Sequence, residues 1–221
     1  INIAFEGIDG SGKSSLIKLI KNNLTEAHNK VKVMEWFRQK SQRDLANIFN
    51  LGGEMTPEIL AALHASSTLS MLDQEKSSTG IFLWDRYVFS SYCSTVIRGL
   101  NPQIAKNILS LFPEPQLTII LLSDPALCYD RICQRDGINF YESGLDRFYT
   151  GFSRNIGLNK FKNSEVNKTL TKECFISTMD DWNCLIQTCT IKNSVVIHNF
   201  DINDAEAIEN IMKEIVIVCG F

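Results

Sequence analysis

The 221-residue sequence has no apolar stretch long enough to span a lipid bilayer and no signal-peptide pattern. It also has no long basic stretch, and 22 Lys and Arg residues are outnumbered by 25 Asp and Glu residues, giving a net charge of −3. Extended binding to a nucleic-acid backbone depends on many clustered cations. We therefore expect no membrane partner, no nucleic-acid partner and a cytoplasmic location.

The cysteines lack the C-x-x-C spacing that is typical of zinc sites and of dithiol redox sites. There are 7 of them, an odd number, and they are scattered from Cys93 to Cys219. This pattern favours reduced, mostly buried thiols in a reducing compartment over zinc ligands or disulfides.

The sequence does contain a phosphate-binding pattern. Residues Gly7–Ser14 read Gly-Ile-Asp-Gly-Ser-Gly-Lys-Ser and fit G-x-x-x-x-G-K-[ST], the P-loop. The apolar run Ile3–Phe5 before it indicates a strand, and the spacing of apolar residues in Leu16–Ile20 after it indicates a helix. This strand–loop–helix context distinguishes a phosphate site from a glycine-rich turn that matches by chance.

The residue types of this loop suit a phosphate group. Glycines tolerate the positive φ values and the close backbone approach that a phosphate requires, and free N–H groups at the helix start point at the anion. Lys13 would reach the outer phosphates and the Ser14 hydroxyl would hold Mg²⁺. The candidate nucleotide-binding residues are Gly7, Gly10, Ser11, Gly12, Lys13, Ser14 and Ser15.

Apolar runs alternate between strand-like and helix-like along the chain. Strands are expected at 1–5, 31–37, 81–84, 117–122 and 194–197. Helices are expected at 14–28, 42–49, 56–75, 87–98, 102–111, 125–135, 145–155, 180–190 and 204–218, with polar, weakly patterned segments at 136–144 and 159–172. Strands separated by helices imply an α/β fold whose parallel sheet is covered on both faces. With no internal repeat or linker, we expect one domain over residues 1–221.

A second candidate site lies at the end of the strand expected at 81–84, where Asp85, Arg86 and Tyr87 follow. Ligands of open parallel sheets bind outside the carboxyl ends of the strands, so Asp85 and Arg86 are expected to face the same crevice as the P-loop. An acid there can organise Mg²⁺ and its waters, and an arginine can grip a phosphate with paired donors. The alternative is a polar strand end that caps the next helix.

Together these segments resemble the thymidylate kinases, a family of nucleoside monophosphate kinases. Phe5–Ser15 looks like that family's phosphate loop, including its extra acid at Asp9, and residues 85–90 are similar to its D-R-Y/H segment. Residues 130–144, with the run Phe-Tyr-Glu-Ser-Gly at 140–144, resemble its mobile lid and the residues behind it. The resemblance extends to about residue 152. It implies a P-loop kinase fold with a five-stranded parallel sheet, helices on both faces and a lid at about 131–144.

The family transfers the γ-phosphoryl group of ATP to dTMP, giving dTDP. The resemblance therefore implies an ATP- and Mg²⁺-dependent transferase of nucleotide biosynthesis whose partners are small-molecule nucleotides. Members commonly dimerise through helices beside the sheet, so the resemblance also makes a homodimer an assembly to expect. No protein nucleophile is needed for this reaction, and the cysteines are not catalytic candidates.

The resemblance also assigns roles to single residues. It implies that Asp9 lies near the acceptor's sugar and phosphate, that Asp85 orders metal or water, and that Arg86 holds the acceptor phosphate. Arg131 and Arg135 would cover the transferring group when the lid closes, although their i,i+4 spacing also fits a solvated helix face. The candidate catalytic residues are Lys13, Asp9, Asp85, Arg86, Arg131 and Arg135, and the candidate metal ligands are Ser14 and Asp85.

The acceptor site is less defined. Its candidate residues are Asp9, Arg38, His64, Arg86, Tyr87 and Tyr141, and Lys40 and Arg43 compete with Arg38 for the acceptor phosphate. The family usually carries a Phe and, four residues later, an Arg that recognise thymine, whereas residues 63–69 here read Leu-His-Ala-Ser-Ser-Thr-Leu. The base that is recognised and the role of residues 156–193 stay open; a Trp and a Cys at 182 and 184 indicate that this segment is packed.

Two other functions are compatible with these patterns. A deoxynucleoside kinase on the same fold would need a base near the sugar hydroxyl, and Glu35 could serve. A nucleotide-binding module without kinase activity would keep the P-loop alone. A GTP-binding switch is disfavoured, because the nearest approach to its N-K-x-D motif, at residues 167–170, lacks the Asp. The Asp-Arg-Tyr sequence favours a monophosphate acceptor.

Overall fold

The computed structural model of the chain describes residues 1–26, 30–35, 44–45, 49, 55–135, 137–148, 161 and 168–220. Its centre is a parallel sheet of five strands in the order β2-β3-β1-β4-β5. The strands are β1 (Asn2–Gly7), β2 (Val31–Glu35), β3 (Ile81–Asp85), β4 (Leu117–Leu122) and β5 (Ser194–His198). The α/β fold with a parallel sheet is therefore confirmed.

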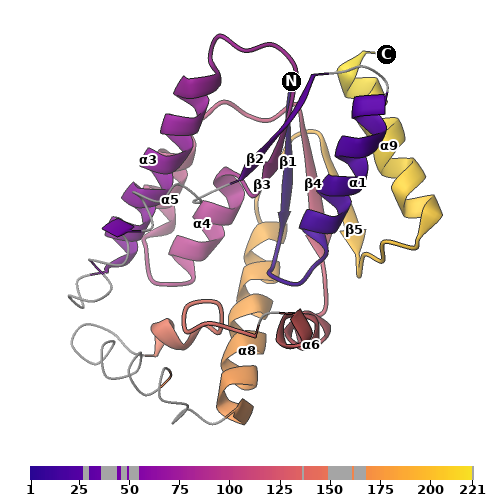
Figure 1. Cartoon of the computed structure of the whole chain (residues 1–221). Helices are drawn as coiled ribbons and strands as arrows, with labels where there is room; N and C mark the ends of the chain where they lie inside the picture. Colours follow the sequence, from indigo (N-terminus) through magenta and orange to yellow (C-terminus); the bar gives the residue numbers. More distant parts are fainter. Residues whose placement is uncertain are drawn as a thin grey trace.

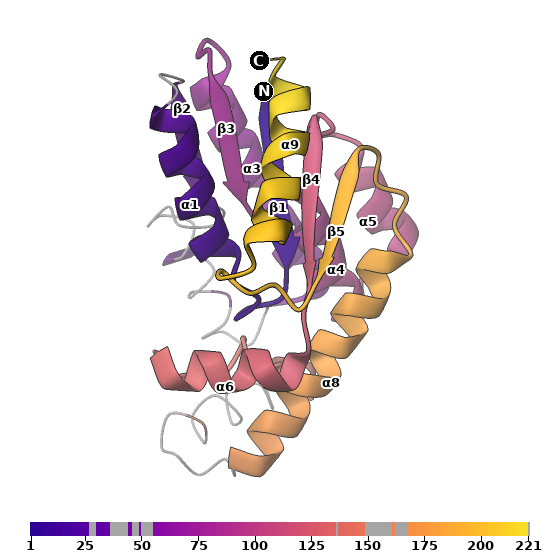
Figure 2. The ribbon, with the colours of Figure 1, turned by 90° about the vertical axis from the view of Figure 1, so that its right-hand side faces the viewer.

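Helices cover both faces of the sheet (Figures 1 and 2). One face carries α1 (Lys13–Glu26) and α9 (Ala205–Cys219), and the other carries α3 (Pro57–Glu75), α4 (Val88–Val96), α5 (Pro102–Leu109) and the upper part of α8 (Lys168–Gln187). The helix α6 (Pro125–Arg135) crosses below the carboxyl ends of the strands, and the short 3-10 helix η1 (Leu145–Arg147) follows it in the chain.

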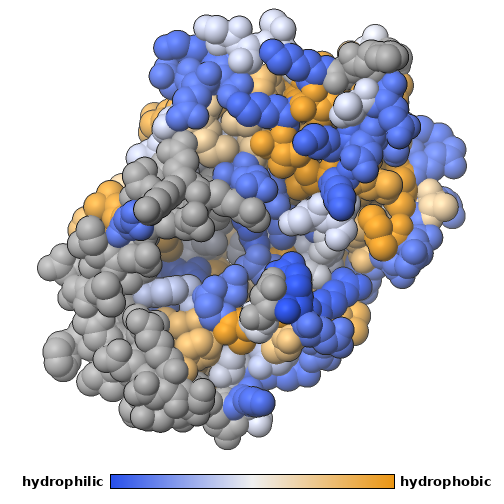
Figure 3. Space-filling view, viewed as in Figure 1, coloured by the Kyte–Doolittle hydropathy of each residue, from blue (hydrophilic) through white to orange (hydrophobic). Residues whose placement is uncertain are grey.

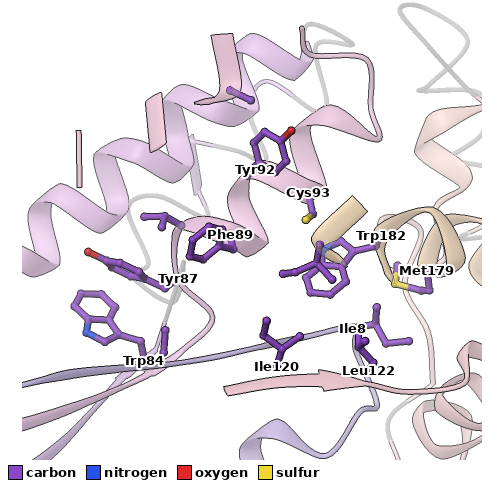
Figure 4. Close-up of a cluster of buried hydrophobic side chains, with 14 of the residues drawn as sticks. Ile8, Trp84, Tyr87, Phe89, Tyr92, Cys93, Ile120, Leu122, Met179 and Trp182 are labelled. Atoms are coloured by element: carbon purple, nitrogen blue, oxygen red, sulfur yellow. The ribbon is translucent and has the colours of Figure 1, made fainter. Parts of the chain in front are cut away.

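The alternation of side chains along the strands divides the core into two layers. In β1, Ile3 and Phe5 pack toward α1 and α9, whereas Ala4 faces the helices on the other side. The layer on the side of Ala4 is rich in aromatic residues from different elements, among them Trp84 of β3 and Trp182 of α8 (Figure 4). Both faces of β4 are buried, which explains its continuous apolar sequence. In the part of the chain that the structure describes, no helix is both long enough and apolar enough to cross a membrane.

Several expected elements have the predicted bounds. Helix α3 begins where expected, with Thr56 as its N-cap accepting a hydrogen bond from Ile59 N at 3.3 Å and with Pro57 as its first residue. The strand at 117–122 and the helix at 125–135 match residue for residue. Of the helix expected at 42–49, only residues 44–45 and 49 are described, and they are helical.

The helix expected at 180–190 is present, but its predicted start was wrong. It is the end of α8, which begins at Lys168, inside the segment expected to be weakly patterned. Its buried stripe contains Thr171, Cys174 and Thr178, polar or small side chains that concealed the helical period. Of the helix expected at 145–155, residues 145–148 are described and contain the 3-10 turn Leu145–Arg147, while the rest of that prediction lies outside the described residues.

The cysteines are all free thiols, but the expectation that most are buried was wrong, because only 3 of the 7 are. Trp182 packs in the core as expected of a packed segment, whereas Cys184 is exposed.

Candidate active site

The loop between β1 and α1 is held between two other elements. Gly10 and Gly12 have φ values of 81° and 96°, which only glycine adopts easily. A Cβ atom on Gly10 would lie 2.6 Å from the Cys128 carbonyl oxygen of α6, and one on Gly12 would lie 3.0 Å from the Phe200 ring. The glycines therefore let α6 and the segment after β5 approach the loop backbone.

Lys13 lies under this loop at the start of α1. Its ammonium donates to the Ile8 carbonyl oxygen at 2.7 Å and lies 3.4 Å from Ser11 Oγ. Burial, reinforced by the positive charge of Arg86, lowers the pKa of Lys13 to about 8. Among the described residues, the hydrogen bonds of the ammonium go only to polar loop atoms, so a phosphate oxygen in the loop would supply the countercharge that these atoms lack.

Ser14 and Asp85 bring two oxygen atoms together. Ser14 Oγ donates to Asp85 Oδ2 at 2.9 Å, because α1 begins beside the carboxyl end of β3. A hydroxyl and a carboxylate are the ligands that Mg²⁺ prefers. Within the described ranges, no cluster of three or more His, Cys, Asp or Glu side chains is placed to hold a metal ion. A cation bound at Ser14 and Asp85 would therefore complete its shell with water or with phosphate oxygens.

Arg86 follows β3 in a left-handed conformation, with φ 70°. This turn directs its guanidinium back under the P-loop, where it donates to Asp9 Oδ1 at 2.6 Å and to the Gly7 carbonyl at 2.9 Å. Burial opposes ionisation of Asp9, but the charges of Arg86 and Lys13 outweigh it and lower the pKa of Asp9. The result is a fixed cation beside the loop that is held by an ionised carboxylate.

The cationic side of α6 faces the same space. Arg131 Nη1 donates to the Gly10 carbonyl at 3.3 Å, and Arg135 lies one turn further along the helix. These groups surround a cleft of about 890 Å³ in the region where Figure 3 shows hydrophilic side chains between the strand ends and α6. Ten of the predicted residues line it: Asp9, Gly10, Gly12, Lys13, Ser14, Ser15, Asp85, Arg86, Arg131 and Arg135.

His64 does not line this cleft. It is 6% exposed on α3, and its Nδ1 lies 3.2 Å from Ser91 Oγ of α4. Burial, together with the charge of Arg98, lowers the pKa of His64 to about 3, so the ring is neutral at physiological pH. Thr68, in the segment 63–69 that lacks the family's Phe and Arg, is buried and donates to the His64 carbonyl at 3.1 Å. Neither side chain offers a contact to a base in the cleft.

The two predicted tyrosines also lie outside the cleft lining. Tyr87 is 1% exposed, stacks at a tilt on Trp84, and donates its hydroxyl proton to the Pro113 carbonyl at 3.1 Å. Tyr141 is half-buried with its ring edge-on to Phe140. The three basic candidates for the acceptor phosphate, Arg38, Lys40 and Arg43, lie outside the described residues.

The structure adds residues that were not among the candidate site residues. Glu142 lines the cleft, and its carboxylate accepts from the Asn139 N–H at 3.1 Å; burial raises its pKa. Phe200 and Asp201 line it from the segment after β5. The rule that ligands bind beyond strand carboxyl ends would have indicated both, since they lie shortly after the strand predicted at 194–197. Glu35, the candidate base of a deoxynucleoside kinase, also lines the cleft at the end of β2.

Comparison with known proteins gives one consistent result. The family model for thymidylate kinase matches residues 5–173, which include the P-loop, the Asp85–Arg86 turn and both α6 arginines. A probable thymidylate kinase of Pyrobaculum aerophilum is 33% identical over 148 residues, covering 63% of this chain and 73% of that protein. Probable thymidylate kinase 1 of Saccharolobus solfataricus is 34% identical over 143 residues, covering 63% and 74%. A thymidylate kinase of Acholeplasma laidlawii is 30% identical over 138 residues, covering 59% and 69%.

Proposed function

Since the chain belongs to the thymidylate kinase family, we propose that it transfers the γ-phosphoryl group of ATP to dTMP, giving ADP and dTDP. The observation that supports this most is the pairing of two anion sites in one cleft. The P-loop with Lys13 forms one, and the Asp9-held guanidinium of Arg86 forms the other. A reaction that joins two phosphate-bearing substrates needs both.

On the donor side, the P-loop amides and Lys13 hold the β- and γ-phosphates of ATP. Ser14 and Asp85 are the residues that would hold Mg²⁺, and their two oxygen atoms fit its preference. The bound ion would neutralise charge on the phosphate oxygens.

On the acceptor side, Arg86 grips the dTMP phosphate and Asp9 keeps the guanidinium in place. An oxygen of that phosphate attacks the γ-phosphorus in line, and the bond to the β-phosphate oxygen breaks as ADP leaves. The protein contributes by positioning the two phosphates and stabilising their charge, so neither a nucleophilic side chain nor a general base is required.

We further propose that residues 131–144 serve as a lid on a single catalytic domain. Arg131 already contacts the Gly10 carbonyl, and Arg135 faces the cleft from the same helix. Closure over ATP would bring both guanidinium groups onto the transferring phosphoryl group.

The free thiols suit the cytoplasm as the place of the reaction. Dimerisation stays a prediction.

Product analysis tests this proposal. The chain is incubated with Mg²⁺ and ATP and with dTMP, thymidine or no acceptor, and the nucleotides are separated by anion-exchange chromatography. We expect dTDP and ADP in equal amounts from dTMP. Formation of dTMP from thymidine would instead favour a nucleoside kinase with Glu35 as base. Binding of ATP without turnover on any acceptor would indicate a nucleotide-binding module.

A further inference from the structure

We propose that Glu6, a buried glutamate of β1, is a positioning residue for the acceptor phosphate: it holds Arg86 through Ser90 and through the Tyr87 amide. The inference rests on the proposed function, because it takes Arg86 as the group that binds the dTMP phosphate.

Glu6 occupies a position where packing alone would favour an aliphatic side chain. It is 0% exposed and points from β1 to the same side as Ala4, into the aromatic layer of the core. Burying a carboxyl group there is costly unless hydrogen bonds and a nearby charge compensate. Burial does raise the pKa of Glu6, and the Ser90 hydrogen bond and the charge of Arg86 oppose that effect.

Both carboxyl oxygens of Glu6 accept hydrogen bonds from the turn that carries Arg86. Oε1 accepts from the Tyr87 N–H at 3.2 Å, and Oε2 accepts from the Ser90 hydroxyl. Tyr87 is the N-cap of α4 and its own side chain makes no capping bond, so Glu6 supplies an acceptor at this helix start. The contact anchors the peptide directly after Arg86, whose left-handed φ of 70° is unfavourable for any residue with a Cβ atom.

The hydrogen bonds run from Arg86 to Ser90 and from Ser90 to Glu6. Ser90 has a single hydroxyl proton and donates it to Glu6, which leaves its lone pairs to accept from Arg86 Nη1 at 3.3 Å. The guanidinium is thereby held at three points, by Asp9, by the Gly7 carbonyl and by Ser90. Asp9 lines the cleft, whereas Glu6 acts from below, where substrate cannot reach.

Glu6→Gln tests this arrangement with almost no change in volume. A glutamine amide has one acceptor oxygen and one donor group, so it cannot accept from both the Tyr87 N–H and the Ser90 hydroxyl. If the glutamine N–H₂ group faces Ser90, the Ser90 hydroxyl proton has to turn toward Arg86, where it opposes the N–H donor of the guanidinium. If the glutamine N–H₂ group faces Tyr87 instead, it meets the Tyr87 backbone N–H, and two donors face each other. In either case one support of Arg86 is lost.

The experiment measures dTMP and ATP binding by calorimetry and the corresponding KM values, with thermal unfolding in parallel. We expect Glu6→Gln to raise the Kd and KM for dTMP about tenfold, roughly 1.4 kcal/mol, while the values for ATP change less than about twofold. Ser90→Ala breaks the same link and should act in the same direction, so it carries the test if Glu6→Gln does not fold. Thr95→Ala is the matched control, since Thr95 is buried on α4 and its hydroxyl donates to the Ser91 and Tyr92 carbonyl oxygens of the same helix. It should lower the melting temperature without changing the KM for dTMP.

A double-mutant cycle with Arg86→Ala distinguishes this inference from the proposed function. If Glu6 acts through Arg86, Glu6→Gln adds little to the loss of dTMP affinity that Arg86→Ala causes. A Glu6→Gln protein that is folded and binds dTMP normally would overturn the inference, as would an effect that persists undiminished without Arg86. Should Arg86→Ala itself bind dTMP like the wild type, both the inference and the assignment of Arg86 to the acceptor would be wrong.

Discussion

Replacing Arg86 by alanine removes the cation to which we assign the acceptor phosphate. Its guanidinium contacts Asp9, the Gly7 carbonyl and Ser90, and we assign none of these three acceptor groups to the binding of ATP phosphates. The P-loop amides and Lys13 remain in this variant, and losing the positive charge of Arg86 raises the pKa of Lys13, so its ammonium stays charged. We therefore expect the loss to fall on dTMP and to leave ATP binding nearly intact.

The magnitude follows from the contact that is lost. A hydrogen bond to a charged group contributes roughly 1.5–3 kcal/mol, which corresponds to a rise of about tenfold to about 150-fold in the Kd for dTMP. Arg86→Lys keeps the charge but offers a single ammonium in place of the planar fork. Since the guanidinium uses two nitrogens for three partners, lysine should recover only part of the affinity.

Isothermal titration of each variant with dTMP and, separately, with a non-hydrolysable ATP analogue measures both affinities. Arg147→Ala is the matched control, because Arg147 is a paired arginine, bound to Asp181 at 2.7 Å, that does not line the cleft. Equal weakening of both ligands in Arg86→Ala would refute the placement of Arg86 on the acceptor side.

Three further outcomes are expected. Replacing Arg131 and Arg135 together by alanine should lower kcat more than it raises the KM for dTMP, because lid cations act on charge that develops during transfer; an unchanged kcat would mean a solvated helix face. Gly144→Ala should destabilise the fold by about 2 kcal/mol or more, since Gly144 has φ 74° and a Cβ there would overlap Thr178 Oγ1. Gly137→Ala has the same φ, and its Cβ would meet no atom of the described residues within 4 Å beyond its chain neighbours, so it should cost only the backbone strain; equal melting temperatures of the two variants would contradict this. The preference for dTMP over dUMP in kcat/KM should be weaker than in an enzyme with an aromatic–arginine clamp, because residues 63–69 of α3 contain neither a Phe nor an Arg, and His64 and Thr68 are buried. An exclusive preference for dTMP would show that other residues rebuild the clamp.

The parts of the site that depend on local sequence were predictable. The P-loop requires a strand, a glycine pattern and a helix in immediate succession, and all three can be read from adjacent residues. Asp85 was predictable for a related reason, because carboxyl ends of parallel strands meet at one edge of the sheet. The structure places its carboxylate 2.9 Å from Ser14 Oγ.

The parts that depend on long-range packing were not predictable. Whether His64 faces a ligand or another helix is decided by how α3 packs on α4, and it lies against Ser91. Tyr87 belongs to a motif but turns into the core because the left-handed turn at Arg86 directs the two side chains apart. The partners of Glu6 lie more than 80 residues away in the chain, so no local pattern indicated them.

Phosphoryl transfer from ATP to dTMP at the P-loop is best tested by a comparison of wild type and Lys13→Ala. The measurement is the rate of ADP formation at saturating ATP and Mg²⁺ while dTMP is titrated. We expect a saturable rise with dTMP in the wild type and almost none in Lys13→Ala, with equal melting temperatures, because Lys13 acts on phosphates. A wild-type rate that does not respond to dTMP, or wild-type turnover in a folded Lys13→Ala protein, would contradict it.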